Sequence, residues 1–307
     1  MGQIISEEKM ITVRLKGGLG NQMFQYAFGR SLSIKRGVAL AFDLRFINDR
    51  HPRRRFVFRR FDLDLFGLQP TTTYPLRYPL CSIYPIIAFE KVVRSVKIKK
   101  PIFRKECYFE GGHDFDPDVL DDLNTNWFDG YFQSYRYFSN HDDIIRDDFK
   151  TADNWQGNLK QIVNQIQASE SVCLNVRRTD FVGGGSVSAL GQQYYEAAYE
   201  AIRKCVTNSK IFVFSDDIPW CRENLRFLER PTFVTHDLKG ERFLDYFRLM
   251  KCCKHFIIPN STFAWWAAYL SETCEKRAGM IVAPSKWYDD CNSDNRELLL
   301  EWWLKVS

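Results

Sequence analysis

Residues 10–22 read MITVRLKGGLGNQ, and this stretch decides the fold. Met10 to Lys16 alternates apolar and polar residues, which predicts a β-strand that ends at the glycines of residues 17–20. Asn21 opens a segment whose apolar residues recur at helical spacing, so a helix follows the loop. Val38 to Leu44 is typical of a second strand. The chain therefore begins as strand, glycine loop, helix and strand, which is the start of an α/β domain.

The same alternation of strands and helices returns after residue 150. Residues 45–148, rich in aromatic residues and prolines, give no clear pattern. Beyond them the strands are expected at 171–177, 210–214, 232–234, 255–258 and 280–283, and the helices at 193–205, 242–252, 262–270 and 296–305. This order predicts a doubly wound, Rossmann-like sheet. We place an N-terminal α/β domain at 1–160 and a C-terminal Rossmann-like domain at 161–307.

Composition bounds the class of protein. A chain of 307 residues with 45% hydrophobic and 26% charged residues can bury a real core. Nine cysteines is an odd number and none is spaced as CxxC, so neither a disulfide framework nor a zinc knuckle is indicated. The N-terminus lacks the long apolar core of a signal peptide, and a cytoplasmic location is expected.

The net charge of +5 comes from two basic runs. They favour anionic partners and are compatible with peripheral contact with the inner face of a membrane, although they also suit the solvated edges of ordinary strands and helices. The runs comprise Arg50, Arg53, Arg54, Arg55, Arg59 and Arg60, then Lys91, Arg94, Lys97, Lys99, Lys100, Arg104 and Lys105.

The glycine loop lies where a ligand's phosphates or sugar could approach the backbone. Gly18 and Gly20 permit close approach, and the start of the following helix favours negative charge. A third glycine is missing where a dinucleotide fingerprint requires one, because Met23 stands there, and no Walker lysine occurs. A tight turn with no ligand remains the alternative.

Three further segments place polar side chains after apolar strands. The first ends in Arg177, Arg178 and Asp180, where guanidinium groups suit diphosphate oxygens and a structural ion pair is the alternative. The second ends in Ser215, Asp216 and Asp217, which suit a nucleobase or ribose, or a helix cap. The third brings residues 260–263, Asn-Ser-Thr-Phe, to the start of a helix, where amides can hold a departing diphosphate or a hydroxyl simply caps the helix.

Together these segments resemble glycosyltransferase family eleven, the alpha-1,2-fucosyltransferases. The resemblance is carried by GGLGNQMFQYAFG (17–29), NVRRTD (175–180), FVFSDDIPW (212–220), LMKCCKHFIIPNSTFAWWAAYL (249–270) and IVAPSKWY (281–288). It implies a GT-B type fold, in which two Rossmann-like domains face each other across a cleft. It also implies GDP-fucose as donor, a galactose-terminated glycan as acceptor, inversion at the anomeric carbon and no metal cofactor. Asn175 and Thr179 depart from the histidine and glycine usual in the family.

The resemblance assigns roles to the candidate residues. The catalytic set is Asn21, Arg177, Arg178 and Asp180: the arginines stabilise the leaving phosphate, Asn21 positions fucose and the acceptor hydroxyl, and Asp180 is a candidate base that pairing with an arginine would weaken. The domain at 1–160 takes the acceptor side. The donor-binding set is Gly18, Gly20, Gln22, Asn175, Ser215, Asp216, Asp217, Asn260, Ser261, Thr262 and Phe263.

Two rival functions remain open. Asp62-Leu63-Asp64 matches the DxD of metal-dependent glycosyltransferases, although such short acidic patterns arise by chance. The basic runs and the aromatic content of 15% are also those of a non-enzymatic protein that binds anionic glycans or nucleic acid. We expect no nucleic-acid partner. The residues do not specify the acceptor, the linkage or the oligomeric state.

Overall fold

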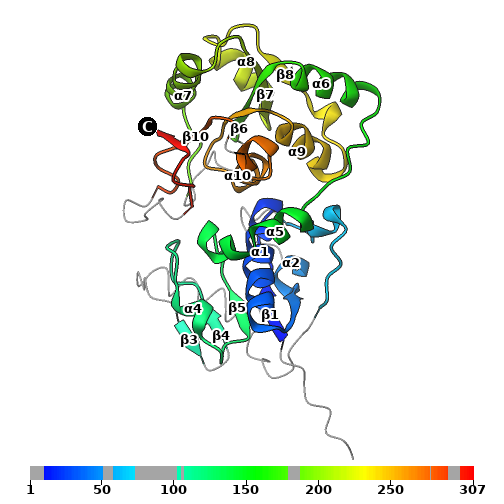
Figure 1. Ribbon diagram of the computed structural model, residues 1–307, viewed down its shortest axis with the longest axis vertical. Coiled ribbons are helices and arrows are strands. Elements are labelled where there is room, and N and C mark those ends of the chain that lie inside the picture. The colour runs from blue at the N-terminus through cyan, green and yellow to red at the C-terminus, as the bar shows by residue number, and fades with distance from the viewer. Residues whose placement is uncertain are drawn as a thin grey trace, which may run out of the picture. The chain divides into compact units, whose positions relative to one another are not determined.

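The computed structural model describes residues 10–50, 58–72, 102–104, 107–178, 187–276, 278–289 and 298–307 (Figure 1). The chain divides into two compact units, Met1–Asp148 and Phe149–Ser307. Each unit has its own β-sheet. The boundary expected after residue 160 falls within helix α6, Gly157–Gln167.

The N-terminal unit is built on a five-stranded sheet in the order β2-β1-β5-β4-β3. Strand β1 lies between β2 and β5 and is parallel to both, while β3 alone runs antiparallel, to β4. The strands are β1 Met10–Arg14, β2 Ala39–Asp43, β3 Ile102–Arg104, β4 Cys107–Phe109 and β5 Trp127–Asp129.

Helix α1, Leu19–Arg36, lies against β1 and β2 (Figure 1). Gly29 permits this close approach, because a Cβ atom there would lie 2.7 Å from side-chain atoms of both Val13 and Leu40. Phe28 stacks on Phe132 with ring centroids 3.8 Å apart. The remaining elements of this unit are α2 Arg45–Asn48, η1 Leu63–Phe66, α4 Asp118–Asp121, η2 Tyr135–Tyr137, η3 Ser139–His141 and α5 Asp142–Asp148.

The C-terminal unit is built on a six-stranded sheet in the order β11-β10-β9-β6-β7-β8, with all pairs parallel. In chain order, β6, β7 and β8 are added toward one edge of the sheet. The next three strands, β9, β10 and β11, are added toward the opposite edge, beginning beside β6. This is the Rossmann strand order, with its switch point between β6 and β9. The strands are β6 Glu170–Val176, β7 Ser209–Ser215, β8 Thr232–Val234, β9 His255–Ile257, β10 Ile281–Pro284 and β11 Leu304–Val306.

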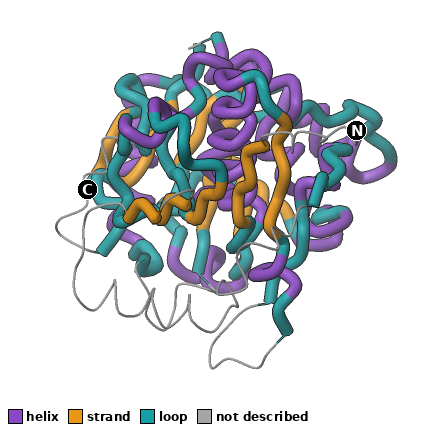
Figure 2. Tube along the Cα trace, turned by 90° about the horizontal axis from the view of Figure 1, so that it is seen from below, coloured by secondary structure: helices purple, strands orange, loops and turns teal. Residues whose placement is uncertain are grey.

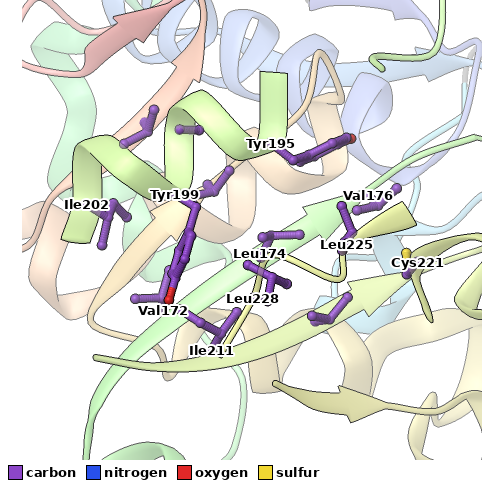
Figure 3. Close-up of a cluster of buried hydrophobic side chains, with 14 of the residues drawn as sticks. Val172, Leu174, Val176, Tyr195, Tyr199, Ile202, Ile211, Cys221, Leu225 and Leu228 are labelled. Atoms are coloured by element: carbon purple, nitrogen blue, oxygen red, sulfur yellow. The ribbon is translucent and has the colours of Figure 1, made fainter. Parts of the chain in front are cut away.

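The core of this unit follows the two-residue period of its strands. Val172, Leu174 and Val176 of β6 pack with Tyr199 and Ile202 of helix α7, Gln192–Cys205 (Figure 3). The helices, drawn in purple in Figure 2, are α6, α7 Gln192–Cys205, α8 Ile218–Asn224, α9 Leu244–Lys251, α10 Thr262–Tyr269 and α11 Glu272–Glu275. Short turns η4 His236–Leu238 and η5 Glu241–Phe243 precede α9.

Two expected helices differ in the structure. The helix expected from residue 242 begins only at Leu244, because Arg242 and Phe243 have positive φ angles of 47° and 66°. The helix expected at 296–305 is wrong over its described residues, where turns lead into strand β11. Within the described part of the chain, no helix is both long enough and apolar enough to cross a membrane.

Candidate functional site

The candidate residues of the C-terminal unit gather at the carboxyl ends of β6, β7 and β9. Strand β6 pairs with β7 on one side, through Val176↔Ser215, and with β9 on the other, through Leu174↔Ile257. The residues that follow these strands therefore lie side by side at the switch point of the sheet. Ligands of open α/β sheets bind at such a point.

The two arginines after β6 are held by the two aspartates after β7. Arg177 Nη1 lies 3.2 Å from Asp216 Oδ2, and Arg178 Nε lies 3.6 Å from Asp217 Oδ2. The backbone N–H of Arg178 donates to Asp216 Oδ1 at 2.9 Å. The Arg178 guanidinium also lies over the Trp220 ring, 4.1 Å from its centroid. The structural alternative, an ion pair, is thus present, and both guanidinium groups are held in place at the strand end.

These arginines remain accessible while they are held. Their side chains are 31% exposed for Arg177 and 20% for Arg178. An arginine has five N–H donors in a fixed fork, and such a fork can contact a carboxylate and a second anion together. The pair can therefore bind a diphosphate without giving up its orientation.

The turn after β7 is ordered by its own polar groups. Ser215 Oγ accepts from the Asp217 N–H at 2.9 Å, and Asp217 Oδ1 accepts from the Trp220 N–H at 3.1 Å, which caps α8. The Ser215 N–H donates to the Tyr246 hydroxyl, and the Ser215 carbonyl lies 2.7 Å from Nε2 of His236. The helix-cap alternative is therefore realised for Asp217. Sequence reasoning missed His236 and Tyr246 at this turn, because both residues lie outside the β7 segment.

The turn after β9 leads directly into α10. Asn260 is buried and donates from Nδ2 to the carbonyls of Ser188 and Trp287, which is a structural use of its amide. Ser261 occupies the capping position but makes no side-chain cap bond. Phe263 packs its ring against Phe247, 5.2 Å between centroids. The start of α10 thus carries no side-chain cap, and its dipole favours an anion.

Asn175 lies inside the sheet rather than at its edge. Its side chain is buried on β6 and donates from Nδ2 to the Phe214 carbonyl at 3.1 Å. Thr179 and Asp180, together with the glycines at 183–185, lie outside the described residues. The roles predicted for Asp180 and for residue 175 stay predictions.

In the N-terminal unit the glycine loop follows β1 as expected and leads into α1. Gly17 has a φ angle of +80°, and a Cβ atom there would lie 2.4 Å from Asn21 Nδ2, so only glycine fits. Gly18 takes the capping position of α1 without a side-chain cap, and Gly20 is buried in the first turn. Asn21 Oδ1 accepts from Gln133 Nε2 at 2.9 Å.

Gln22 holds the chain together rather than facing outward. It is fully buried, and its Nε2 donates to the carbonyls of Gly17 and Arg60 at 3.1 and 2.8 Å. Its Oε1 accepts from the Asp62 N–H at 2.9 Å. The side chain thereby fastens residues 60–62 to the glycine loop, which is a use that the sequence did not suggest.

Buried charges support the carboxyl edge of the N-terminal sheet. Asp129 accepts from Arg14 at 2.9 Å and from Lys16 at 2.7 Å, with all three side chains at most 9% exposed. Burial by itself would raise the pKa of Asp129, but the cations Lys16 and Arg14 overcome it and hold the pKa below its ordinary value. Asp43 pairs with Arg14 and Arg45 in the same network.

The DxD pattern of the metal-dependent alternative lies in the 3₁₀ turn η1. Leu63 is buried while Asp64 is exposed, as a solvated turn requires. Across the described residues, no group of three or more histidine, cysteine or acidic side chains is arranged to hold a metal ion. The basic residues at 53–55 and 91–100 lie outside the described part of the chain.

Known proteins share this fold. The structure of NodZ alpha-1,6-fucosyltransferase soaked with GDP-fucose matches with a TM-score of 0.51 and 13% identity, over 86% of this chain and 93% of that one. The fold prediction, an α/β protein of the GT-B type with two Rossmann-like units, is confirmed. The cleft expected between the two domains stays a prediction.

Two bacterial relatives match over almost their whole length, and a mouse relative over about two thirds of its length. An alpha-1,2-colitosyltransferase of Escherichia coli is 27% identical over 97% of this chain and 99% of its own. The O-antigen biosynthesis glycosyltransferase WbnK of Escherichia coli is also 27% identical, over 95% and 99%. The mouse galactoside 2-alpha-L-fucosyltransferase Sec1 is 29% identical over 86% and 65%. The model of the family described as Glycosyl transferase family 11 matches residues 73–306, so the chain belongs to that family.

Proposed function

We propose that the chain is an inverting alpha-1,2-L-fucosyltransferase. It would move L-fucose from GDP-β-L-fucose to the 2-hydroxyl of a galactose-type acceptor, in the synthesis of a glycan or surface polysaccharide. The observation that carries the proposal is the arrangement at the C-terminal switch point, where Arg177 and Arg178 follow β6 and the start of α10 follows β9, the strand that pairs with β6. Both features bind phosphate oxygens.

The arrangement suits the electrostatics of the reaction. Attack by the acceptor oxygen on the face opposite GDP converts the β-linkage into an α-linkage and leaves charge on the β-phosphate. Arg178 and Arg177 would stabilise that charge, with the amide groups at Ser261 to Phe263. The same charges would do the work of a divalent cation, so we propose that no metal cofactor is needed.

The relatives support a GDP-sugar as donor, and they favour two candidate sugars. NodZ is named as an alpha-1,6-fucosyltransferase and was soaked with GDP-fucose, and Sec1 is named as a 2-alpha-L-fucosyltransferase. The colitosyltransferase among the relatives favours GDP-colitose as the second candidate. Colitose is L-fucose without its 3-hydroxyl, so both donors present the same diphosphate to the arginines.

The test is product analysis with each donor in turn. Purified protein is incubated with GDP-fucose or GDP-colitose and a panel of galactosides, with and without EDTA, and the product linkage and anomeric configuration are read by NMR. We expect an α-linked fucose on the 2-position and equal rates with EDTA. Transfer of colitose alone would replace fucose as the donor sugar, and loss of activity with EDTA would contradict the metal-free mechanism. GDP-fucose bound but never transferred, with salt-sensitive binding of anionic glycans, would favour the non-enzymatic alternative.

A further inference from the structure

Strands β1 and β5 of the N-terminal sheet are parallel neighbours. The loops that follow them therefore begin side by side at the carboxyl edge of this sheet. The β1 loop leads to Asn21 and the β5 loop leads to Gln133. Gln133 Nε2 donates to Asn21 Oδ1 at 2.9 Å and joins the two loops.

This bond fixes which way the Asn21 carboxamide faces. Its oxygen accepts from a glutamine that is only 8% exposed. A Cβ atom built on Gly17 would lie 2.4 Å from Nδ2 of Asn21, which places this nitrogen beside Gly17. With the oxygen turned to Gln133, the N–H₂ edge of Asn21 is the edge turned to the glycine loop.

We propose that Gln133 is a positioning residue, which holds Asn21 so that the asparagine presents N–H donors, and not its carbonyl oxygen, to a sugar oxygen. The inference rests on the proposed function, in which Asn21 positions fucose and the acceptor hydroxyl. The Nδ2 donors of an asparagine held in this way can bond to a lone pair on a sugar oxygen, and a carboxamide is no base for the proton of the attacking hydroxyl. That proton must leave to another group.

The loop that carries Gln133 is held under backbone strain. Phe132, directly before it, has a φ angle of +50°, which a bulky side chain rarely adopts. The Glu110 carboxylate accepts from the N–H groups of Tyr131 and Phe132 at 2.6 and 3.0 Å, and the Phe132 ring stacks on Phe28. Such strain persists only where the surroundings enforce it, and it concentrates at functional sites. Gln133, the next residue, is the one that donates to Asn21.

The charge-changing variant Gln133→Glu tests the orientation. A carboxylate only accepts hydrogen bonds, so it would attract the nitrogen of Asn21 and turn the carbonyl oxygen to the substrate. We expect Gln133→Glu to lower kcat by a factor on the order of 10², with the KM for the nucleotide sugar unchanged. Gln133→Met should lower kcat by a smaller factor. In an Asn21→Ala background both substitutions should have little further effect. Gln165→Glu, an exposed glutamine on α6 with the same charge change, is the matched control.

The outcomes separate a positioning role from a structural one. If Gln133→Glu lowers kcat by the same factor in the wild-type and Asn21→Ala backgrounds, Gln133 serves only the fold, and the inference is overturned. Kinetics are measured with whichever sugar the wild type transfers. If it transfers neither, the proposed function fails, and neutron diffraction of the wild type still decides the inference, because it separates amide nitrogen from oxygen. Deuterium on Gln133 Nε2 pointing at Asn21 Oδ1 would support it, and the reverse orientation would refute it.

Discussion

At the scale of single residues, we expect substitution of Arg178 to lower activity without changing the stability of the fold. Its side chain lies at a strand end and is 20% exposed, with partners in Asp217 and Trp220. Arg178→Ala should lower kcat/KM about 10²- to 10³-fold, because in the proposed mechanism it removes one donor to the leaving phosphate. Arg178→Lys should fall between, since a lysine keeps the charge but loses the planar fork.

The matched control for Arg178 is Arg203→Ala. Arg203 pairs with Glu200 on the exposed face of α7, and its side chain is 54% exposed. We expect wild-type turnover from this variant, and a circular dichroism melt close to that of the wild type for both alanine variants. Near-normal turnover in Arg178→Ala would remove the arginine from the mechanism.

Gln22 has the opposite character, because its side-chain bonds go to the backbone. Gln22→Leu should lower the free energy of unfolding by about 1–3 kcal/mol, since the Gly17 and Arg60 carbonyls and the Asp62 N–H lose a buried partner. Urea unfolding measures the change, with Gln167→Leu at the exposed end of α6 as control. Unchanged stability together with weaker GDP-fucose binding would instead place Gln22 on the donor, as the sequence predicts.

At the scale of elements, two glycines with similar backbone angles flank α1 and should respond differently to alanine. Gly17 and Gly37 have φ angles of +80° and +64°, so Ala should cost both about 1 kcal/mol of stability or more. Only at Gly17 would the new Cβ meet Asn21, whereas nothing lies within 4 Å of the position at Gly37. Gly17→Ala should therefore lower kcat strongly and Gly37→Ala should leave it unchanged. Equal activities of the two variants at matched stability would contradict this.

The regular elements could be predicted because each shows its own period. The strand expected at Met10–Lys16 is β1, Met10–Arg14, and the helix expected at 193–205 is α7, Gln192–Cys205. Strand β11 was missed because three residues of a short edge strand carry no period, and an apolar stretch was interpreted as a helix. Strand β5 was missed for the same reason, although it is the strand that pairs with β1.

The candidate site was predictable only where its residues directly follow a strand. Arg177, Arg178, Asp216 and Asp217 meet in the structure because β6 and β7 are adjacent and parallel, which an alternating pattern indicates. Gln133 and Glu110 come from the middle region, far from Asn21 in the sequence. Their proximity depends on long-range strand pairing, and no local pattern reports it.

At the scale of the whole molecule, the two units place their candidate residues at corresponding positions but use different side chains there. In each, candidate residues directly follow the carboxyl ends of parallel strands: β1 in the N-terminal sheet, and β6, β7 and β9 in the C-terminal sheet. The C-terminal unit presents arginines there, held by aspartates, which suits an anion. In the N-terminal unit the buried cations pair with Asp129 and Asp43, and the carboxamide of Asn21 follows β1, a group that in the proposed function suits the hydroxyls of a sugar.

Glu110 ties the stability of the molecule to pH. Burial raises the pKa of its carboxyl from 4.5 to about 7, against the lowering effects of the Tyr131 N–H, Lys16 and the Phe132 N–H, while Asp129 adds to the rise. A carboxyl whose pKa is higher in the folded state stabilises the fold when protonated. This contribution is present below pH 4.5 and is lost as the pH rises through about 7.

A comparison with Glu110→Gln isolates this carboxyl from the other titrating groups. The free energy of unfolding of the wild type, relative to the variant, should be greatest below pH 4.5 and should decrease by up to about 3 kcal/mol by about pH 8, because one pKa unit corresponds to about 1.4 kcal/mol. Urea unfolding at several pH values measures the difference. If the difference in free energy of unfolding between wild type and variant grows with pH instead, the backbone N–H groups and Lys16 lower the pKa of Glu110 more than burial raises it. The carboxylate form would then be the one that holds the strained turn at Phe132 and, through it, Gln133.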